Sequence, residues 1–219
     1  MEEEYRNLIM DNSAAIILGG DGNDTKYFRD EILKADKIIA CDRGADYLYD
    51  LEIKPDVLIG DMDSINKNVY NYFVKNNVSF KVYNSIKDQT DDYIAFRCAF
   101  QDYNCSVLNV YAFEGGRMDH FISILMNAER SISKGKRINF RGKNCTIYSF
   151  MNNMELNTKR GEIISIFTFS EAITGKCDGL FYNISNRKFK HCESIGVSNK
   201  AIENKVYISI PVSYTHLRA

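Results

Sequence analysis

Between residues 13 and 137, short apolar runs alternate with segments of helical character, and this alternation restricts the fold more than any other feature of the sequence. The apolar runs are SAAIIL, KIIAC, DVLIG, FKVY and SVLNVYA, and the helix-like segments are 24–34, 43–51, 66–76, 90–101 and 119–133. Such alternation is typical of parallel strands joined by crossover helices. We therefore predict an α/β domain at residues 1–137, with a mainly parallel sheet and helices on both faces.

After residue 137 the strand-like runs follow one another without helices between them. They are INF, CTIYSF, EIISIFTF, GLFY and KVYISI, separated by Gly, Asn, Asp and Ser. Short strands separated by turn residues are typical of all-β domains. We predict a smaller all-β domain, a sandwich or a barrel, at residues 138–212. We expect residues 213–219 to lie outside it, as an extension or a remnant of cloning or sequencing.

The charge balance and the cysteines limit the partners and the compartment. Lys and Arg total 28 against 29 Asp and Glu, so no overall basic field would attract nucleic acid or an anionic membrane. The longest apolar runs are too short to span a bilayer. The six cysteines are scattered without a CxxC pair, and we recognise no secretory leader ahead of them. We expect reduced thiols and a cytoplasmic protein.

Parallel sheets bind ligands beyond the carboxyl ends of their strands, and polar stretches occupy those positions here. The first is GGDGND at 19–24, where glycines such as Gly20 would let the backbone approach a phosphate. A plain turn explains it equally well, because it has neither dinucleotide-fingerprint nor P-loop spacing. The second is CDRGAD at 41–46, where Asp42 ends a strand and Gly44 begins a helix. Asp42 is either a helix cap or a carboxylate that faces a ligand.

The third stretch, GDMDS at 60–64, sets two carboxylates one residue apart at the end of a buried strand. In an extended segment alternate side chains share a face, so Asp61 and Asp63 can converge. Carboxylates this close repel each other unless a cation lies between them. Mg²⁺ suits the arrangement, because it takes one or two carboxylates and leaves its other positions to waters and substrate phosphates. The alternative is a solvated turn with a helix cap.

The fourth stretch, KDQTDD at 87–92, begins a helix. Asp88 is suited to the N-cap and Asp91 to the third helical position (N3), a charge placement that the helix dipole favours. That explanation accounts for one of the acids. It does not account for a lysine beside several acids, which a site for both phosphate and metal does explain.

The last stretch is EGGRMDH at 114–120, between a strand and an apolar helix. Arg117 offers a planar donor fork that matches phosphate oxygens. Asp119 could cap the helix, orient Arg117, or do both. His120 is a lone histidine on this helix, and we expect it to have a structural role or to support neighbouring site residues rather than to be catalytic. His191 and His216 offer no metal-ligand spacing with it. Carboxylates for Mg²⁺, glycine-rich backbone and an arginine are the parts of phosphoryl-type transfer, which indicates a Mg²⁺-nucleotide-dependent transferase.

The set DRGA (42–45), GDMDS (60–64), KDQTD (87–91) and GGRMDH (115–120) resembles the thiamine pyrophosphokinase family. GLFY (179–182) and VSN (197–199) are similar to motifs of that family's β domain. The resemblance implies a Rossmann-like nucleotide-binding domain followed by a β-sandwich, assembled as a homodimer with thiamine sites at the subunit interface. It implies transfer of the pyrophosphoryl group of ATP to the thiamine hydroxyl, which gives thiamine diphosphate and AMP.

By the same resemblance, functional roles carry over to individual positions. Asp61, Asp63 and Asp91 would be catalytic and hold the metal, Arg117 and Asp119 would address the nucleotide phosphates, and Lys87 would lie near the transferred group. The remaining nucleotide-binding positions would be Gly20, Asp42, Gly44, Asp88, Thr90 and Gly116, and the thiamine-binding positions would be Tyr182, Ser198 and Asn199.

Three other functions are compatible with parts of the pattern. DMDSI superficially resembles the nucleophile motif of haloacid-dehalogenase-type phosphatases, but that motif follows the first strand of its fold and here it follows the third. A nucleotide-binding or ligand-sensing protein without turnover would not require so many carboxylates around an anionic ligand. A pyrophosphokinase that acts on another alcohol, such as a pterin, would use the same phosphate-handling parts.

Overall fold

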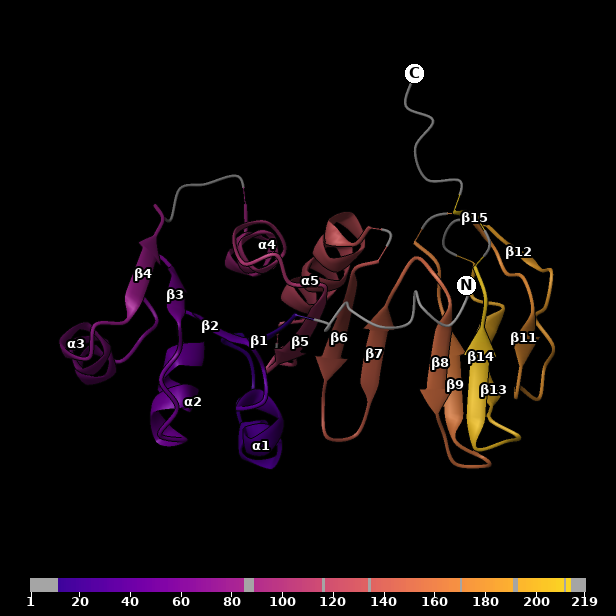
Figure 1. The fold of residues 1–219 in the computed structure, drawn as a ribbon, viewed down its shortest axis with the longest axis horizontal. Helices are drawn as coiled ribbons and strands as arrows, with labels where there is room; N and C mark the ends of the chain where they lie inside the picture. The colour runs from indigo at the N-terminus through magenta and orange to yellow at the C-terminus, as the bar shows by residue number, and fades with distance from the viewer. Residues whose placement is uncertain are drawn as a thin grey trace, which may run out of the picture. The chain divides into compact units, whose positions relative to one another are not determined.

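The computed structural model describes residues 12–84, 89–115, 117–133, 135–169, 171–190, 193–210 and 212–213 (Figure 1). The chain forms two compact units. The first holds the described residues up to Ile132 together with Lys136–Ser149, and the second holds Ser133, Gly135 and the described residues from Phe150 onward. Lys87, Asp88 and Gly116 lie outside the described residues, as do residues 214–219 of the expected tail.

The first unit is built on a seven-stranded sheet with the order β4-β3-β2-β1-β5-β6-β7. Strands β1 to β6 are parallel, and β7 is antiparallel to β6. The chain moves outward from β1 to β4 and then crosses to β5 on the other side of β1, so β1 and β5 flank the point where the strand order reverses. The strands are β1 (Ser13–Ile17), β2 (Lys37–Cys41), β3 (Val57–Gly60), β4 (Ser79–Val82), β5 (Val107–Tyr111), β6 (Arg137–Arg141) and β7 (Thr146–Ser149).

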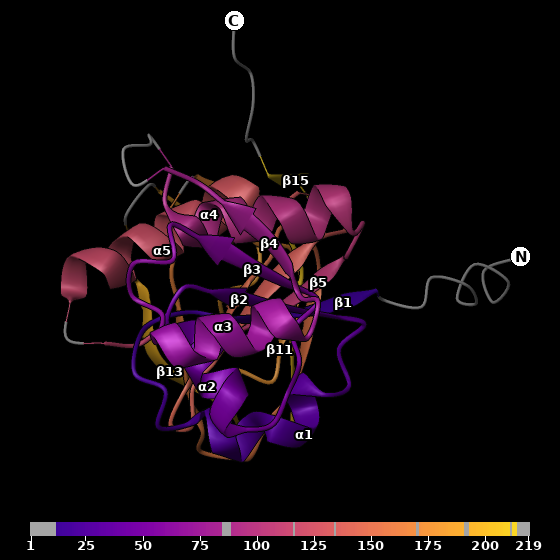
Figure 2. The same ribbon diagram turned by 90° about the vertical axis from the view of Figure 1, so that its left-hand side faces the viewer.

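Helices cover both faces of this sheet, as the sequence predicts (Figures 1 and 2). Alternate residues of a strand face opposite sides, so Ala14 and Ile16 of β1 pack in one core and Ala15 and Ile17 in the other. One face carries η2 (Thr25–Phe28), α1 (Arg29–Ile32), α2 (Gly44–Asp50) and α3 (Lys67–Lys75); the other carries α4 (Asp91–Arg97), the π-helical turn η3 (Cys98–Asp102) and α5 (Met118–Ser131). None of the described helices has both the length and the hydrophobicity needed to cross a bilayer.

The division between the two units falls later in the chain than the sequence predicts. Residues 138–149, which the sequence assigns to the second domain, form β6 and β7 of the first sheet. β6 continues the parallel series by pairing Val107 with Arg137, and a short hairpin returns the chain as β7. The change of sequence texture at residue 137 therefore marks the end of the helices, and the sheet continues for two more strands.

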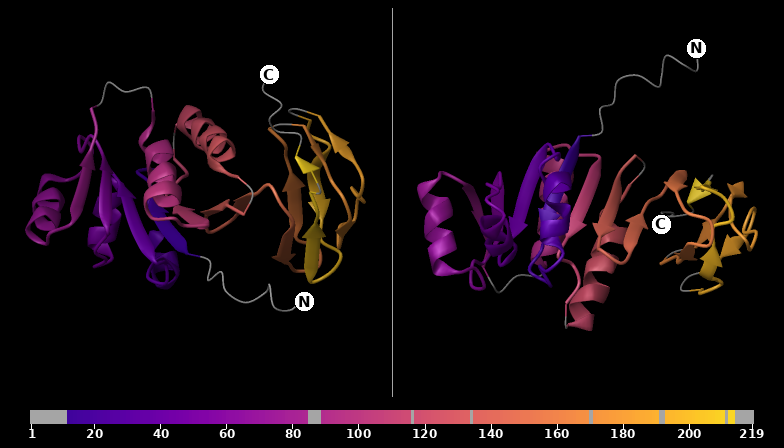
Figure 3. Two further views of the ribbon diagram at one scale, coloured as in Figure 1. Left: turned by 45° about the horizontal axis from the view of Figure 1, so that its top comes forward. Right: turned by 90° about the horizontal axis from the view of Figure 1, so that it is seen from below.

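The second unit is all-β, as predicted, and its strand pairs are antiparallel (Figure 3). The pairing orders are β12-β10-β15, β11-β14-β8 and β13-β9. A small core that includes Leu180, Phe189 and Val206 lies among them. The strands are β8 (Met154–Asn157), β9 (Ile163–Ile166), β10 (Ala172–Ile173), β11 (Cys177–Asp178), β12 (Lys188–Phe189), β13 (Gly196–Lys200), β14 (Lys205–Ile208) and β15 (Val212–Ser213).

Candidate active site

A cluster of carboxylates forms where β2 and β3 end and α4 begins. Asp42 follows β2, Asp61 and Asp63 follow β3, and Asp91 is the first residue of α4. These strands are parallel and adjacent, so their carboxyl ends meet at one edge of the sheet. Asp42 and Asp63 each experience repulsion from Asp61 and Asp91. The structure therefore brings together the three predicted metal ligands and Asp42.

Gly60 makes room for the Asp42 carboxylate. The Asp42 N–H donates to the Ile59 carbonyl at 3.1 Å, and the Met62 N–H donates to Asp42 Oδ1 at 3.0 Å. A Cβ on Gly60 would overlap that same oxygen, and the φ of Gly60 is +147°. Asp42 and Met62 also have positive φ values, 41° and 63°. Such backbone persists only where the surroundings hold it, and it is common at functional sites.

Two carboxyls of the cluster have raised pKa values. Burial, together with repulsion from Asp91, Asp61 and Asp63, raises the pKa of Asp42 to about 7, although the Met62 N–H acts to lower it. The pKa of Asp63 is also raised, first by its hydrogen bond with the Asp61 carboxyl and then by the Asp61 charge. The Asp63 N–H donates to Asp61 Oδ1 at 3.2 Å and keeps the two side chains adjacent. A bound cation would relieve this repulsion.

Asn127 of α5 holds the beginning of α4. Its amide nitrogen donates to Thr90 Oγ1 at 2.8 Å and to Asp92 Oδ2 at 2.9 Å. Thr90 occupies the N-cap position, which the sequence assigned to Asp88, so Asp91 is the first helical residue and not the third. The Thr90 hydroxyl is engaged by α5 and makes no cap bond. Asp92 is buried, with 8% of its surface exposed. Neither Asn127 nor Asp92 was among the sequence candidates, because an asparagine inside a helical pattern carries no local signal of its contacts.

Gly20 and Gly44, which the family resemblance assigns to nucleotide binding, allow close packing of the backbone in this structure. The Gly20 N–H donates to the Ala112 carbonyl at 2.9 Å, and a Cβ on Gly20 would overlap the carbonyl oxygen of Glu114. A Cβ on Gly44 would overlap the carbonyl oxygen of Ile17. The loop after β1 is therefore pinned to the loop after β5, and the Gly20 N–H is already engaged.

Arg117 and Asp119 form a pair at the start of α5. The Arg117 Nε donates to Asp119 Oδ1 at 3.2 Å and its Nη2 donates to Oδ2 at 2.5 Å, with both side chains exposed. The Arg117 guanidinium lowers the pKa of Asp119, and Asp119 in turn raises the pKa of Arg117. The sequence allows Asp119 to cap the helix or to orient Arg117. In the structure Asp119 orients Arg117, through the two hydrogen bonds that it accepts from the guanidinium. His120 is exposed on the same helix.

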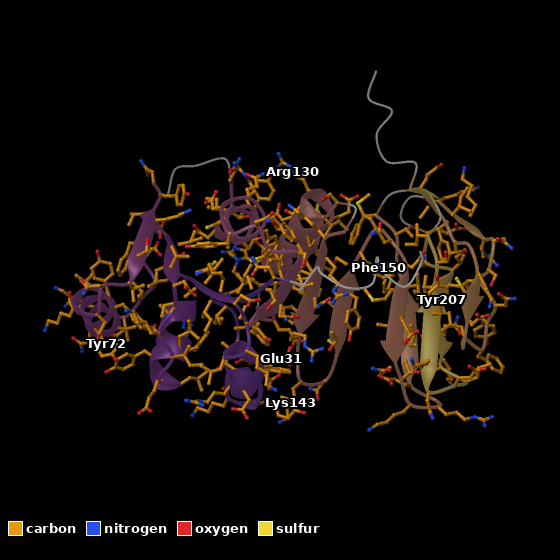
Figure 4. The ribbon with its side chains drawn as sticks, in the orientation of Figure 1. Glu31, Tyr72, Arg130, Lys143, Phe150 and Tyr207 are labelled. Carbon is orange, nitrogen blue, oxygen red and sulfur yellow. The ribbon has the colours of Figure 1, made fainter. Side chains whose placement is uncertain are left out.

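An ion-pair network that the sequence did not indicate ties α1 to β5 and β6. Glu31, labelled in Figure 4, accepts hydrogen bonds from the Tyr111 hydroxyl at 3.0 Å and from Arg141 at 2.8 and 3.0 Å. The hairpin after β6 adds a contact to the loop after β1, since the Lys143 N–H donates to Asp24 Oδ2 at 3.1 Å. Because Arg141 and Lys143 lie 110 and 119 residues from their partners, only the strand order could have predicted these contacts.

In the second unit, Tyr182 and Asn199 lie together. Asn199 is 1% exposed, its Oδ1 accepts the Tyr182 N–H at 2.9 Å and its Nδ2 donates to the Tyr182 carbonyl at 2.9 Å. The Asn199 side chain thus holds two segments of backbone together. Ser198 has a positive φ of 58° beside an irregularity in the β13–β9 register, and Tyr182 is 62% exposed. The exposed groups of this set are the Tyr182 ring and Ser198.

Within the described part of the chain, no three His, Cys, Asp or Glu side chains are gathered into a ready-made metal cage. Mg²⁺ commonly uses only one or two carboxylates, with waters and phosphates as its other ligands. The adjacent carboxylates of Asp61 and Asp63 fit that mode of binding. The five cysteines whose placement is described are free thiols: Cys41, Cys98, Cys105, Cys145 and Cys177.

The fold defines a protein with an α/β unit followed by an all-β unit and with carboxylates gathered at one edge of its parallel sheet, and the chain is similar to known proteins. Residues 28–140, which are 113 of the 219, match the family described as thiamin pyrophosphokinase, catalytic domain. The chain therefore belongs to the thiamin pyrophosphokinase family, whose members are kinase-type transferases.

Individual relatives agree with this placement. The thiamine pyrophosphokinase of Bacillus subtilis (strain 168) is 27% identical over 171 residues, which cover 76% of this chain and 79% of the relative. The crystal structure of thiamine pyrophosphokinase from Bacillus subtilis has a TM-score of 0.70 at 22% identity, covering 90% of this chain and 93% of that one. A family protein from Enterococcus faecalis has a TM-score of 0.71 at 17% identity, covering 92% and 95%.

Proposed function

We propose that this chain transfers the pyrophosphoryl group of ATP to the hydroxyl of thiamine, giving thiamine diphosphate and AMP. Membership of the family supports the reaction class, and the single observation that carries the proposal is the acidic cluster of Asp42, Asp61, Asp63 and Asp91. Raised pKa values at Asp42 and Asp63 reflect repulsion among these carboxylates, together with the burial of Asp42 and the hydrogen bond between Asp63 and Asp61. The cation of a Mg²⁺-polyphosphate complex would relieve that repulsion.

Asp61 and Asp63 are the residues proposed to hold Mg²⁺, with Asp91 as a third ligand. When bound, Mg²⁺ neutralises charge on the ATP phosphates and orients them. Asp61 and Asp63 suit this role because backbone geometry already holds them adjacent, through the Asp63 N–H on Asp61 Oδ1. Asp42 is fixed by the Met62 N–H behind them and adds negative charge to the same cluster.

The remaining nucleotide contacts are proposed for residues around this cluster. Arg117 presents its guanidinium in an orientation set by Asp119, so a phosphate oxygen would compete with that carboxylate for the donor fork. Thr90 is held by Asn127, which supports its assignment to the nucleotide site. Lys87, Asp88 and Gly116, which fall outside the described residues, keep their proposed roles from the family resemblance.

In the chemical step, the thiamine hydroxyl oxygen attacks the β-phosphorus of ATP in line with the leaving AMP oxygen. The bond from the β-phosphorus to the bridging α,β-oxygen breaks, and the β,γ-pyrophosphoryl group moves to thiamine. The hydroxyl proton leaves to solvent or to a carboxylate, and general-base help has little effect where the transition state is loose. The chain's contribution is therefore positioning and charge neutralisation.

The acceptor site is proposed for the second unit, with Tyr182, Ser198 and Asn199 as its residues. The exposed Tyr182 ring offers a face on which the flat heteroaromatic cation of thiamine could stack. Asn199 would act by holding the Tyr182 backbone, because its amide is engaged there. We assign this site to the all-β unit, which continues from Phe150.

We further propose that the chain works as a homodimer in the cytoplasm. Exposed apolar side chains support a subunit contact: on α5, Met118, Ile122 and Met126 are spaced four residues apart and therefore share one helix face. Free thiols at the described cysteines suit a reducing compartment. Sedimentation of the full chain tests the dimer, and a monomer at assay concentration would contradict it.

One experiment tests the reaction. The protein is incubated with ATP, Mg²⁺ and thiamine, and the products are identified by mass spectrometry. Thiamine diphosphate with AMP is the expected result. ADP with thiamine monophosphate would contradict pyrophosphoryl transfer, and turnover only with another alcohol, such as a pterin, would change the acceptor. A phosphoaspartate trapped at Asp61 would favour a phosphatase.

A further inference from the structure

The loop of residues 19–24, here called the glycine loop, leaves β1 at the point where the strand order reverses. On one side it is pinned to the loop after β5. The Gly20 N–H donates to the Ala112 carbonyl at 2.9 Å, and the Asp21 N–H donates to the Glu114 carbonyl at 2.5 Å. Ligands of open α/β sheets bind at this position of the fold. The exact course of the glycine loop thus shapes the surface that a nucleotide would meet.

On its other side, the glycine loop is held by Tyr47 of α2. The Tyr47 hydroxyl donates to the Gly20 carbonyl at 2.5 Å. The Tyr47 ring lies directly against Gly22, where a Cβ would overlap the ring carbons. The guanidinium of Arg43 lies over the ring, 5.9 Å from its centroid. The Tyr47 side chain therefore fixes the direction of the Gly20 carbonyl, packs against Gly22 and faces the Arg43 guanidinium.

Two local hydrogen bonds also hold the glycine loop in its conformation. The Asn23 N–H donates to Asp21 Oδ1 at 3.0 Å, and the hydroxyl of the buried Thr25 donates to the Gly22 carbonyl at 2.7 Å. These contacts lie within residues 21–25. The Tyr47 side chain connects the loop to α2, which begins at Gly44, two residues after Asp42 of the acidic cluster.

We propose that Tyr47 is a positioning residue for nucleotide binding. Its hydroxyl holds the Gly20 carbonyl and thereby fixes the glycine loop in the shape that accepts ATP. The proposal rests on the proposed function, because it concerns the nucleotide of that reaction. Neither the sequence motifs nor the family resemblance pointed to Tyr47. Its role is indirect, and it makes no contact with the reacting atoms.

Tyr47→Phe tests the hydroxyl alone, because phenylalanine keeps the ring against Gly22 and under Arg43. We expect KM for ATP to rise roughly three- to tenfold, the range of a typical net hydrogen bond, with kcat and KM for thiamine at wild-type values. Tyr49→Phe is the matched control, since Tyr49 lies on the same helix and packs on Tyr72 and Phe73 through its ring. This control should leave all three constants unchanged.

Hydrogen exchange provides the second measurement. Amides of residues 18–25 should exchange faster in Tyr47→Phe than in the wild type or in Tyr49→Phe, while amides of β2 keep their protection. An active Tyr47→Phe variant with wild-type KM for ATP would overturn the role of Tyr47 and leave the proposed function intact. A wild-type protein that does not turn over ATP and thiamine would instead refute the proposed function, and with it the nucleotide role of Tyr47.

Discussion

Asp42→Asn should stabilise the ligand-free protein at alkaline pH, at the expense of activity. The folded-state pKa of Asp42 is about 7 against 3.8 for an ordinary aspartate. At ~1.4 kcal/mol per pKa unit, ionising this carboxyl in the folded chain costs at most about 4 kcal/mol. Solvent around the partly exposed cluster weakens the effect, so we expect a gain of about 2 kcal/mol. Asparagine keeps an oxygen for the Met62 N–H and tolerates a φ of 41°.

The sign of the pH dependence follows from the direction of the pKa change. A carboxyl whose folded-state pKa is raised contributes stability that is fully present below its unfolded pKa. That contribution is lost as the pH rises through about 7. Asparagine carries no charge at any pH, so the advantage of Asp42→Asn over the wild type should be largest at pH 8 and shrink towards pH 4.

The assay is urea unfolding at pH 5 and pH 8 in the presence of a chelator, so that no divalent cation neutralises the cluster. Asp50→Asn, which changes an exposed carboxylate of α2, is the control and should have little effect at either pH. An equal change in the free energy of unfolding at both pH values, or a loss of stability at pH 8, would refute the electrostatic argument. Turnover by Asp42→Asn should fall, because the proposed nucleotide site loses a charge.

Three further outcomes are expected. Asp61→Asn and Asp63→Asn should each lower kcat on the order of a hundredfold or more with melting temperatures no lower than the wild type; wild-type turnover in both would defeat the metal assignment. Gly60→Ala should lower the free energy of unfolding in urea by about 3 kcal/mol, since it combines backbone strain with overlap of Asp42. The control is Gly161→Ala, at φ +90° with open space around the added Cβ, which should lower it by about 1 kcal/mol. Equal losses in the two variants would argue against the overlap. Glu31→Gln should lose about 1–2 kcal/mol, because the half-buried Arg141 guanidinium loses its carboxylate partner; an unchanged urea midpoint would mean that solvent replaces that partner.

Much of the candidate site could be predicted, because its residues occupy strand ends. Asp42, Asp61 and Asp63 directly follow apolar runs that the sequence identifies as strands. If the sheet is parallel, all three carboxylates must lie at the edge formed by the carboxyl ends of the strands. The interaction of Asp42 with Gly60 could not be predicted in the same way. It depends on the register of β2 against β3, and no local pattern reports that register.

The sequence alone determined the two fold classes, the strands and helices of the first unit as far as α5, and the edge of the sheet that carries the acidic motifs. Periodicity and turn residues are properties of neighbouring positions, so they can be read along the chain. Only the tertiary structure decided that β6 and β7 complete the first sheet, that Gly20 lies between the loop after β5 and Tyr47 of α2, and that Asn127 holds the beginning of α4. Those features arise from contacts between residues far apart in the chain, where strand order and packing decide which groups meet.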